Sequence, residues 1–159
     1  MKKLFNVNHK THNADTALLI TRVGISSLML VHGLPKMFAL FSGEPVQFPA
    51  IFGMSPVVSL TLAVFAEVIG SLFVLFGFGT RLAVIPLIIT MAVAVFNIHA
   101  ADPYVKKEPG LLFLLGYVTL FIMGSGKYSI DNLIFRKVRS VKYGVRRELR
   151  NEEVELAEY

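Results

Sequence analysis

Residues 82–96, "LAVIPLIITMAVAVF", decide the class of fold. Apart from Thr90, every residue in this stretch is apolar, so a helix formed from it would have no polar face. A surface helix of a soluble protein keeps one side for water, whereas a helix that is apolar all round is buried in a large core or crosses a membrane. With its flanking residues the stretch reaches the roughly 20 residues that a bilayer core requires. It therefore favours a membrane-spanning helix over a soluble helical core.

The composition of the whole chain agrees with this interpretation. Of the 159 residues, 54% are hydrophobic and 17% are charged, against about 45–50% and about 25% in soluble domains. The length fits one domain. The chain has no cysteine, which excludes disulfides, thiolate metal sites and covalently attached c-type haem. Any chemistry that needs a thiol would have to come from a partner.

Four segments qualify as membrane spans, and they cover residues 14–41, 56–78, 81–101 and 109–123. We expect an all-α fold, an integral-membrane antiparallel four-helix bundle that occupies residues 14–126. Ser55 and Pro56 form a typical helix start, with a capping side chain before a proline at the first helical position. Thr80 is expected to cap the third span, and Pro109 to open the fourth. The apolar connection over residues 42–55 should lie in the membrane interface or fold back over the bundle.

The ends of the chain differ in charge. Residues 1–13 form a polar N-terminal segment, residues 127–150 a basic amphipathic tail and residues 151–159 an acidic end. With the N-terminus in the cytoplasm, four spans would place thirteen Lys and Arg on the cytoplasmic side and three on the other. This asymmetry predicts a multi-pass inner-membrane protein with both termini in the cytoplasm.

The tail combines basic residues with an apolar stripe. Seven Lys and Arg fall in residues 136–150, and the apolar residues recur at helical spacing: Ile130, Leu133, Ile134, Val138, Val141, Val145 and Leu149. Such a pattern is typical of an amphipathic helix in the interface. We expect it to bind anionic lipid on the inner leaflet, and we favour this over nucleic-acid binding beside so apolar a body.

Several ionisable residues lie inside the predicted spans. Glu67 falls about halfway along the second span, and His32 and Lys36, four residues apart, share one helix face. A charge at this depth costs several kcal/mol unless it is paired or neutralised, so it usually faces the bundle interior or a cavity. His32, Lys36 and Glu67 are therefore the candidate catalytic residues of a proton-transfer or binding pocket. The structural alternatives are a protonated, hydrogen-bonded Glu67, a satisfied His32 and a Lys36 that extends to the headgroups.

Five further residues are candidates for the same pocket: Arg22, Asn97, His99, Glu108 and Tyr117. The antiparallel order of the spans places most of them in the outer half of the bundle, above Glu67. The possible partners of Glu67 are Arg22, His32, Lys36 and the hydroxyl of Tyr117. Arg22 has the alternative of extending to the headgroups, and Glu108 that of an anion at a helix N-terminus. Two histidines can ligate a metal or haem, but their spacing here is not diagnostic, and we predict no metal site.

These residues occur within a set of motifs that resembles the DoxX family. The motifs are "RVGISSLMLVHGLPKMF", "FPA", "AEVIGSLFVLFGFGTRLA", "NIHA" and "GSGKYSID", and together they cover most of residues 18–133. The resemblance implies a four-helix protein of the bacterial inner membrane. One branch of that family includes the membrane subunit of thiosulfate:quinone oxidoreductase, and other members are linked to oxidative-stress complexes. The charged and histidine positions of the family would match Arg22, His32, Lys36, Glu67 and His99.

Three functions remain open at this point. The first is a quinone-interacting, redox-associated membrane subunit, in which the pocket delivers protons and a membrane or soluble redox partner supplies electrons. The second is a non-catalytic scaffold or assembly factor, and the third is a carrier of a small solute or lipid. The expected surroundings are the lipid bilayer and a redox protein or further copies of the chain.

Overall fold

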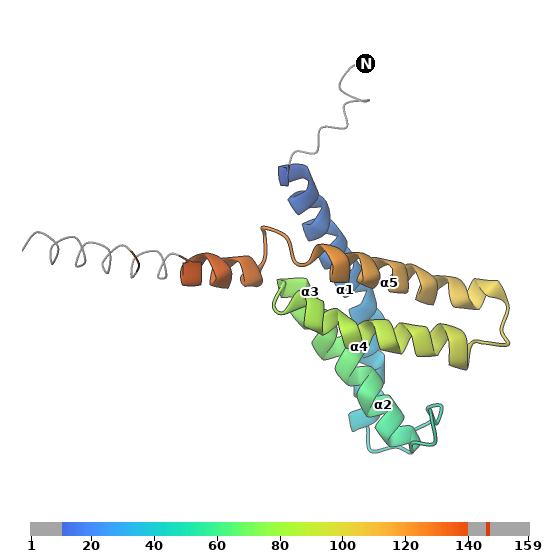
Figure 1. Cartoon of the computed structure of the whole chain (residues 1–159). Coiled ribbons are helices and arrows are strands. Elements are labelled where there is room, and N and C mark those ends of the chain that lie inside the picture. Colours follow the sequence, from blue (N-terminus) through green and yellow to red (C-terminus); the bar gives the residue numbers. More distant parts are fainter. Residues whose placement is uncertain (1–10, 140–145, 147–159) are drawn as a thin grey trace, which may run out of the picture.

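The described part of the chain is entirely helical, as the sequence predicts. The computed structural model describes residues 11–139 and residue 146, and it assigns no strand within them. The elements are α1 (Thr11–Phe41), α2 (Pro56–Val64), the π-helical turn η1 (Phe65–Gly70), α3 (Ser71–Phe76), α4 (Thr80–Val93), the π-helical turn η2 (Ala94–Ile98) and α5 (Tyr104–Met123) (Figure 1). α2, η1 and α3 follow one another without a break, as do α4 and η2. Residues 130–139 are also helical.

Three of these helical segments are long and apolar enough to cross a membrane. They are Asn13–Phe41, Pro56–Phe76 and Thr80–Ile98, and they correspond to the first three predicted spans. The fourth predicted span lies in α5, which carries Lys106, Lys107 and Glu108 close to its start. The described residues therefore give a helical protein with three membrane-capable helices, and the four-span bundle stays a prediction.

The predicted helix starts were partly right. Ser55 Oγ accepts a hydrogen bond from Val58 N at 3.3 Å, and Pro56 follows at the first helical position. The predicted cap by Thr80 was wrong, because Thr80 already lies in α4 and Gly79 precedes it in the left-handed region with φ 56°. The carboxylate of Asp131 supplies the cap and accepts bonds from Gly79 N at 2.7 Å and Thr80 N at 3.2 Å.

The fourth predicted start was also wrong. α5 begins at Tyr104, so Pro109 lies inside the helix and does not open it. Glu108 is consequently beyond the first turn, where an anion would interact best with the free N–H groups of the helix. The alternative of Glu108 as an N-terminal anion is therefore not what the structure shows.

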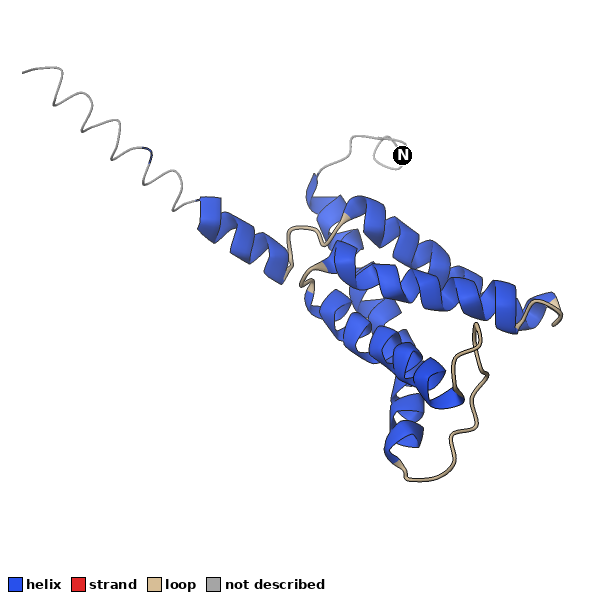
Figure 2. Cartoon of the chain, turned by 60° about the horizontal axis from the view of Figure 1, so that its bottom comes forward, coloured by secondary structure: helices blue, strands red, loops and turns tan. Residues whose placement is uncertain are grey.

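The helices pack into a core that leaves many apolar side chains outside. α4 and α5 lie side by side, and α1 packs against α2, η1 and α3 (Figures 1 and 2). The main buried cluster comprises Leu18, Met29, Val74, Ala83, Val84, Leu87, Met91, Tyr117 and Leu120. Large apolar residues such as Leu82 are nevertheless 75% exposed. Exposed apolar side chains in such number are expected of a protein whose outer face contacts lipid.

The connection over residues 42–55 folds back onto the helices, one of the two arrangements that its apolar residues predicted. Ile51 is buried, and its N–H donates to Ser59 Oγ at 3.1 Å. Val46 and Phe48 pack against the second buried cluster, which is formed by Leu60, Val64 and Val68. This loop therefore closes one end of the helical body.

The opposite end carries Arg22, Arg81 and Lys127, and we call it the basic end. Arg22 is buried there and donates from Nη1 to Ser125 O at 2.7 Å and from Nη2 to Tyr128 O at 2.6 Å. The backbone N–H of Asp131 donates to Gly77 O at 2.9 Å. These bonds attach the segment that follows α5 to α1 and to the end of α3.

The predicted amphipathic tail is only partly described. Residues 130–139 form an exposed helix in which Leu133, Phe135 and Val138 are each more than 60% exposed. Its placement on a membrane surface stays a prediction. The remainder of the tail, the acidic end at residues 151–159 and the polar residues 1–10 lie outside the described residues.

Candidate functional site

The centre of the site is an ion pair between α1 and η1. Lys36 Nζ lies 2.5 Å from Glu67 Oε1. Gly33, one turn before Lys36, makes this approach possible, because a Cβ at Gly33 would lie only 3.0 Å from the Cβ of Glu67 and from Val68 Cγ2. The absence of a side chain at Gly33 therefore lets the two helices come close enough for the lysine to reach the carboxylate.

Glu67 is the deeply buried member of the pair. Its side chain is 1% exposed, against 34% for Lys36. Lys36 Nζ also lies 5.9 Å from the centre of the Phe48 ring, within the range of a cation–π contact. Glu67 Oε2 is buried and has no hydrogen-bond partner among the described residues. One oxygen of the carboxylate is thus held by the ammonium, while the other can still accept a hydrogen bond or a proton.

Glu67 stands in a π-helical turn. η1 contains Glu67, and the second π-helical turn, η2, ends directly before His99. π-Helical turns are rare, and they occur frequently at functional sites because the wider turn redirects the side chains that it carries. Both turns of this protein border the same region, which supports a functional role for it.

Two cavities meet at the ion pair. The polar cavity, of about 160 Å³, is lined by Met29, His32, Lys36, Glu67, Met91, Ala94, Val95, His99, Lys106, Pro109, Gly110 and Phe113. The apolar cavity, of about 230 Å³, is lined by Lys36, Phe48, Ile51, Phe52, Met54, Ser59, Leu62, Ala63, Glu67, Ile89, Thr90, Val93, Ala94 and Ile98. Lys36 and Glu67 line both, so a molecule in either cavity would contact the pair.

The wall of the polar cavity is formed by aromatic and ionisable side chains. The ring of His32 meets Phe113 edge-on, with centres 5.8 Å apart. His99 Nδ1 lies 2.7 Å from Asp102 Oδ2, and Lys106 Nζ donates to Asp102 Oδ1 at 3.4 Å. The bond from His99 lowers the pKa of Asp102 below its usual value, and the nearby charge of Lys106 acts in the same direction.

The structure brings together four of the residues that the sequence singled out. His32, Lys36, Glu67 and His99 line the polar cavity. Tyr117 lies behind it, fully buried, with its ring stacked on Phe113 at 6.2 Å between centres. Its hydroxyl has no hydrogen-bond partner among the described residues, so the predicted bond to Glu67 is not present.

The other three candidates lie elsewhere. Asn97 and Glu108 are exposed and line neither cavity. Arg22 bonds to backbone carbonyls at the basic end and does not extend to the headgroups. Sequence reasoning missed Asp102 and the lining role of Lys106. The available signal was their spacing, because an acid and a lysine at i,i+4 pair readily when the segment between them is helical.

The two cavity histidines, His32 and His99, differ in their surroundings. Among the described residues, no three His, Asp or Glu side chains cluster in a way that could hold a metal ion. His32 and His99 line one cavity, but His99 is occupied by Asp102 and His32 packs against an aromatic ring.

These features define an all-helical membrane protein with an ion-paired carboxylate between two small cavities. Residues 17–100 match the DoxX family, and the chain belongs to that family. It is 32% identical over 136 residues to an uncharacterised protein of Haemophilus influenzae, covering 81% of this chain and 89% of that protein. It is 36% identical over 124 residues to "Inner membrane protein YphA" of Escherichia coli, covering 72% and 87% respectively.

A third relative carries a name that describes an activity. The chain is 29% identical over 129 residues to "Putative oxidoreductase CatD" of Bacillus subtilis, covering 80% of this chain and 92% of that protein. No solved structure matches this chain.

Proposed function

We propose that this protein is a quinone-interacting, redox-associated subunit of the bacterial inner membrane, with the Lys36–Glu67 pair as its reactive centre. The observation that carries the proposal is Glu67 itself. Its carboxylate is 1% exposed, one oxygen is held by Lys36, and the other has no partner in the described part of the chain. A purely structural ion pair would normally satisfy both oxygens, because an unpaired buried acceptor costs about 1–3 kcal/mol.

The two cavities suit the two parts of a membrane quinone. Its ring carries carbonyl oxygens that accept hydrogen bonds, and the polar cavity offers donors from Lys36, His32 and Lys106. Its isoprenoid chain is apolar, and the apolar cavity is lined by aliphatic and aromatic side chains from the loop, α2 and α4. Ligand pockets in general combine an apolar lining with a few placed polar groups.

The chemistry would be reduction of the quinone to a quinol. This step takes up two electrons and two protons, and each proton goes to a carbonyl oxygen. The electrons would come from a redox protein bound to this subunit or from a diffusible reductant. Lys36 would hold a carbonyl oxygen by a charge-assisted hydrogen bond. Glu67 and His32 would relay protons, since both side-chain types can be tuned to exchange protons near neutral pH.

The relatives support parts of this proposal. The Bacillus subtilis protein is named as an oxidoreductase, and the Escherichia coli protein as an inner membrane protein. We extend both descriptions to this chain by its membership of the same family. We propose in addition the topology that the charge distribution predicts, with four spans, both termini in the cytoplasm and the pocket in the outer half of the membrane.

The experiment is to purify the full chain from native membranes in mild detergent and to identify the quinones and proteins that accompany it. We expect a bound quinone in the unchanged protein and at least a tenfold loss in Glu67→Gln, because a hydrogen bond that involves a charged group contributes about 1.5–3 kcal/mol. Glu44→Gln is the matched control, since Glu44 is exposed and lines neither cavity.

The result also separates the proposal from a scaffold role. If neither the unchanged protein nor any variant retains quinone while protein partners still co-purify, the pocket is a packing feature. The protein would then be an assembly factor.

A further inference from the structure

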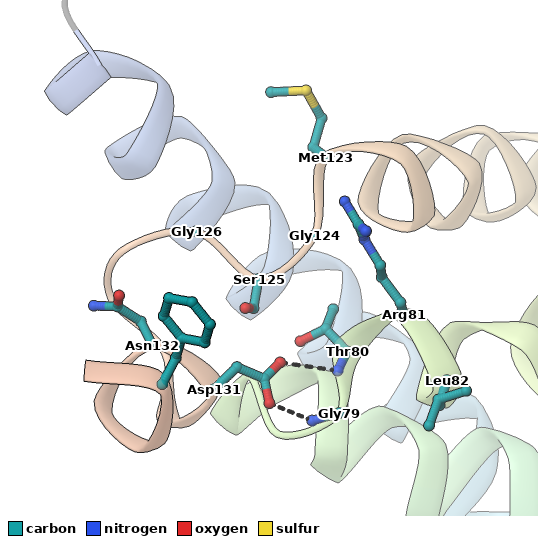
Figure 3. A pocket seen from close by; sticks show the side chains of 11 residues that line it. Gly79, Thr80, Arg81, Leu82, Met123, Gly124, Ser125, Gly126, Asp131 and Asn132 are labelled. Carbon is teal, nitrogen blue, oxygen red and sulfur yellow. Dashed lines mark hydrogen bonds between the residues drawn. The ribbon is translucent and has the colours of Figure 1, made fainter. Parts of the chain in front are cut away.

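A third cavity opens at the basic end, well away from the ion pair. It has a volume of about 690 Å³ and is lined by residues 79–82, 123–126, 131, 132 and 135 (Figure 3). These residues come from the start of α4, from the end of α5 with the turn that follows it, and from the helix at residues 130–139. None of them lines the polar or the apolar cavity.

The lining holds one basic side chain, Arg81, and one acidic side chain, Asp131. Arg81 is exposed, and its Nη2 donates to Ile122 O at 3.1 Å, which fixes the guanidinium above the end of α5. Its remaining N–H groups have no acceptor in the described part of the chain, although a guanidinium offers five donors. The acidic side chain in the lining, Asp131, already binds the N–H groups of Gly79 and Thr80 (Figure 3).

Two glycines in left-handed conformation lie in the lining beside Arg81. Gly124 has φ 81° and Gly126 has φ 73°, a left-handed conformation that side chains rarely adopt. A Cβ at Gly124 would lie 3.5 Å from Arg81 Nε. Thr80 also lines the cavity; the residue is 1% exposed, and its buried hydroxyl has no hydrogen-bond partner among the described residues.

Three apolar side chains of the lining are exposed, and we call them the apolar rim. Leu82 is 75% exposed, Met123 is 52% exposed and Phe135 is 65% exposed. Leu82 lies on a helix that can cross a membrane, immediately after the arginine. The site thus places a fixed cation at the end of an apolar helix, with exposed apolar side chains beside it.

We propose that this cavity binds an anionic phospholipid. The guanidinium of Arg81 would hold the phosphate, which it can contact through two parallel N–H donors. Leu82 and Met123 would contact the acyl chains. A free phosphate ion would use the arginine alone, whereas a phospholipid also covers the apolar rim. This site is distinct from the basic residues further along the tail.

The test is native mass spectrometry of the full chain in mild detergent. The protein would be titrated with phosphatidylglycerol, with phosphatidylcholine and, in a separate arm, with inorganic phosphate. We expect phosphatidylglycerol to be retained at least tenfold more than phosphatidylcholine, and Arg81→Gln to remove this preference. Lys107→Gln removes the same charge at the opposite end and should leave the preference unchanged.

Two further variants guard against misfolding and against a general charge effect. Arg81→Lys keeps the charge but loses the paired donors, and we expect it to restore part of the preference. Leu82→Ser should lower retention of phosphatidylglycerol and leave binding of inorganic phosphate as it was. Equal retention of both lipids, or an equal loss in Arg81→Gln and Lys107→Gln, would overturn the proposal. Binding of inorganic phosphate as tightly as the lipid would assign the site to a free anion.

Discussion

Replacing Lys36 by Met should destabilise this protein far more than replacing Glu67 by Met. The Lys36→Met variant leaves the carboxylate of Glu67 at 1% exposure with no cation beside it. Removing one partner of a buried ion pair typically costs about 3–5 kcal/mol. The Glu67→Met variant leaves an ammonium whose side chain is 34% exposed and can reach water. We expect that variant to cost only about 1 kcal/mol.

The double variant should recover most of the loss. Two methionines match the length of the original side chains and can fill the gap between the helices. Replacement of a buried pair by apolar residues of similar volume is often neutral or stabilising. We therefore expect the double variant within about 1 kcal/mol of the unchanged protein, which corresponds to a coupling of about 3–6 kcal/mol between the two positions.

Thermal unfolding in detergent gives the unfolding midpoints of the unchanged protein, the two single variants and the double variant. A cost of about 3–5 kcal/mol should lower the midpoint of Lys36→Met by about 6–20 °C in a chain of this size, and Glu67→Met by about 2–4 °C. Equal shifts in the two single variants, which add up in the double variant, would refute this reasoning. That outcome would mean that the two side chains do not depend on each other.

Three other outcomes follow from the structure. Gly33→Ala should lower the unfolding midpoint through a cost of about 1–3 kcal/mol, because its Cβ would meet the Cβ of Glu67 at 3.0 Å, whereas Gly24→Ala, with nothing within 4 Å, should not. The bond from His99 lowers the pKa of Asp102 in the folded protein. The stabilisation by this bond should therefore be fully present above the usual Asp pKa of 3.8, and it should be lost as the pH falls through the lower pKa of the folded state. Melting curves between about pH 2 and pH 6 should show this loss, and Asp102→Asn should flatten it. Since the chain has no native cysteine, an impermeant thiol reagent applied to spheroplasts should label Gln47→Cys and spare Lys142→Cys, and the reverse pattern would invert the proposed orientation.

Helical spacing and antiparallel order were enough to single out His32, Lys36 and Glu67 as candidates for one pocket. His32 and Lys36 are four residues apart, and Glu67 lies midway along the next helix. Because the two helices are antiparallel and joined by one connection, His32 and Lys36 are expected on the outer side of Glu67. Burial of a carboxylate in an apolar segment then demands a partner. These arguments leave several partners of Glu67 open, and the structure pairs it with Lys36.

The remaining features depend on contacts that no local pattern encodes. Arg22 donates from Nη1 and Nη2 to the backbone carbonyls of Ser125 and Tyr128, more than 100 residues further along the chain. α4 is capped by Asp131, which comes from beyond the end of α5 and replaces the local cap expected from Thr80. The π-helical turns have no sequence signature. Their positions could therefore not be predicted, including that of η1, which contains Glu67. The predicted start of α5 was also too late. Three charged residues precede Pro109, so the apolar segment begins only at that proline, although the helix begins at Tyr104.

The most direct test of the proposed function is the change in unfolding midpoint that a short-chain quinone causes in the purified full chain. A ligand at 100 times its dissociation constant stabilises the folded state by about 2.7 kcal/mol, which corresponds to a rise of about 5–11 °C. We predict this rise in the unchanged protein and in Glu44→Gln, and its loss in Glu67→Gln at the same quinone concentration. An equal rise in Glu67→Gln, or no rise in the unchanged protein, would contradict the assignment of the Lys36–Glu67 pair as a quinone site.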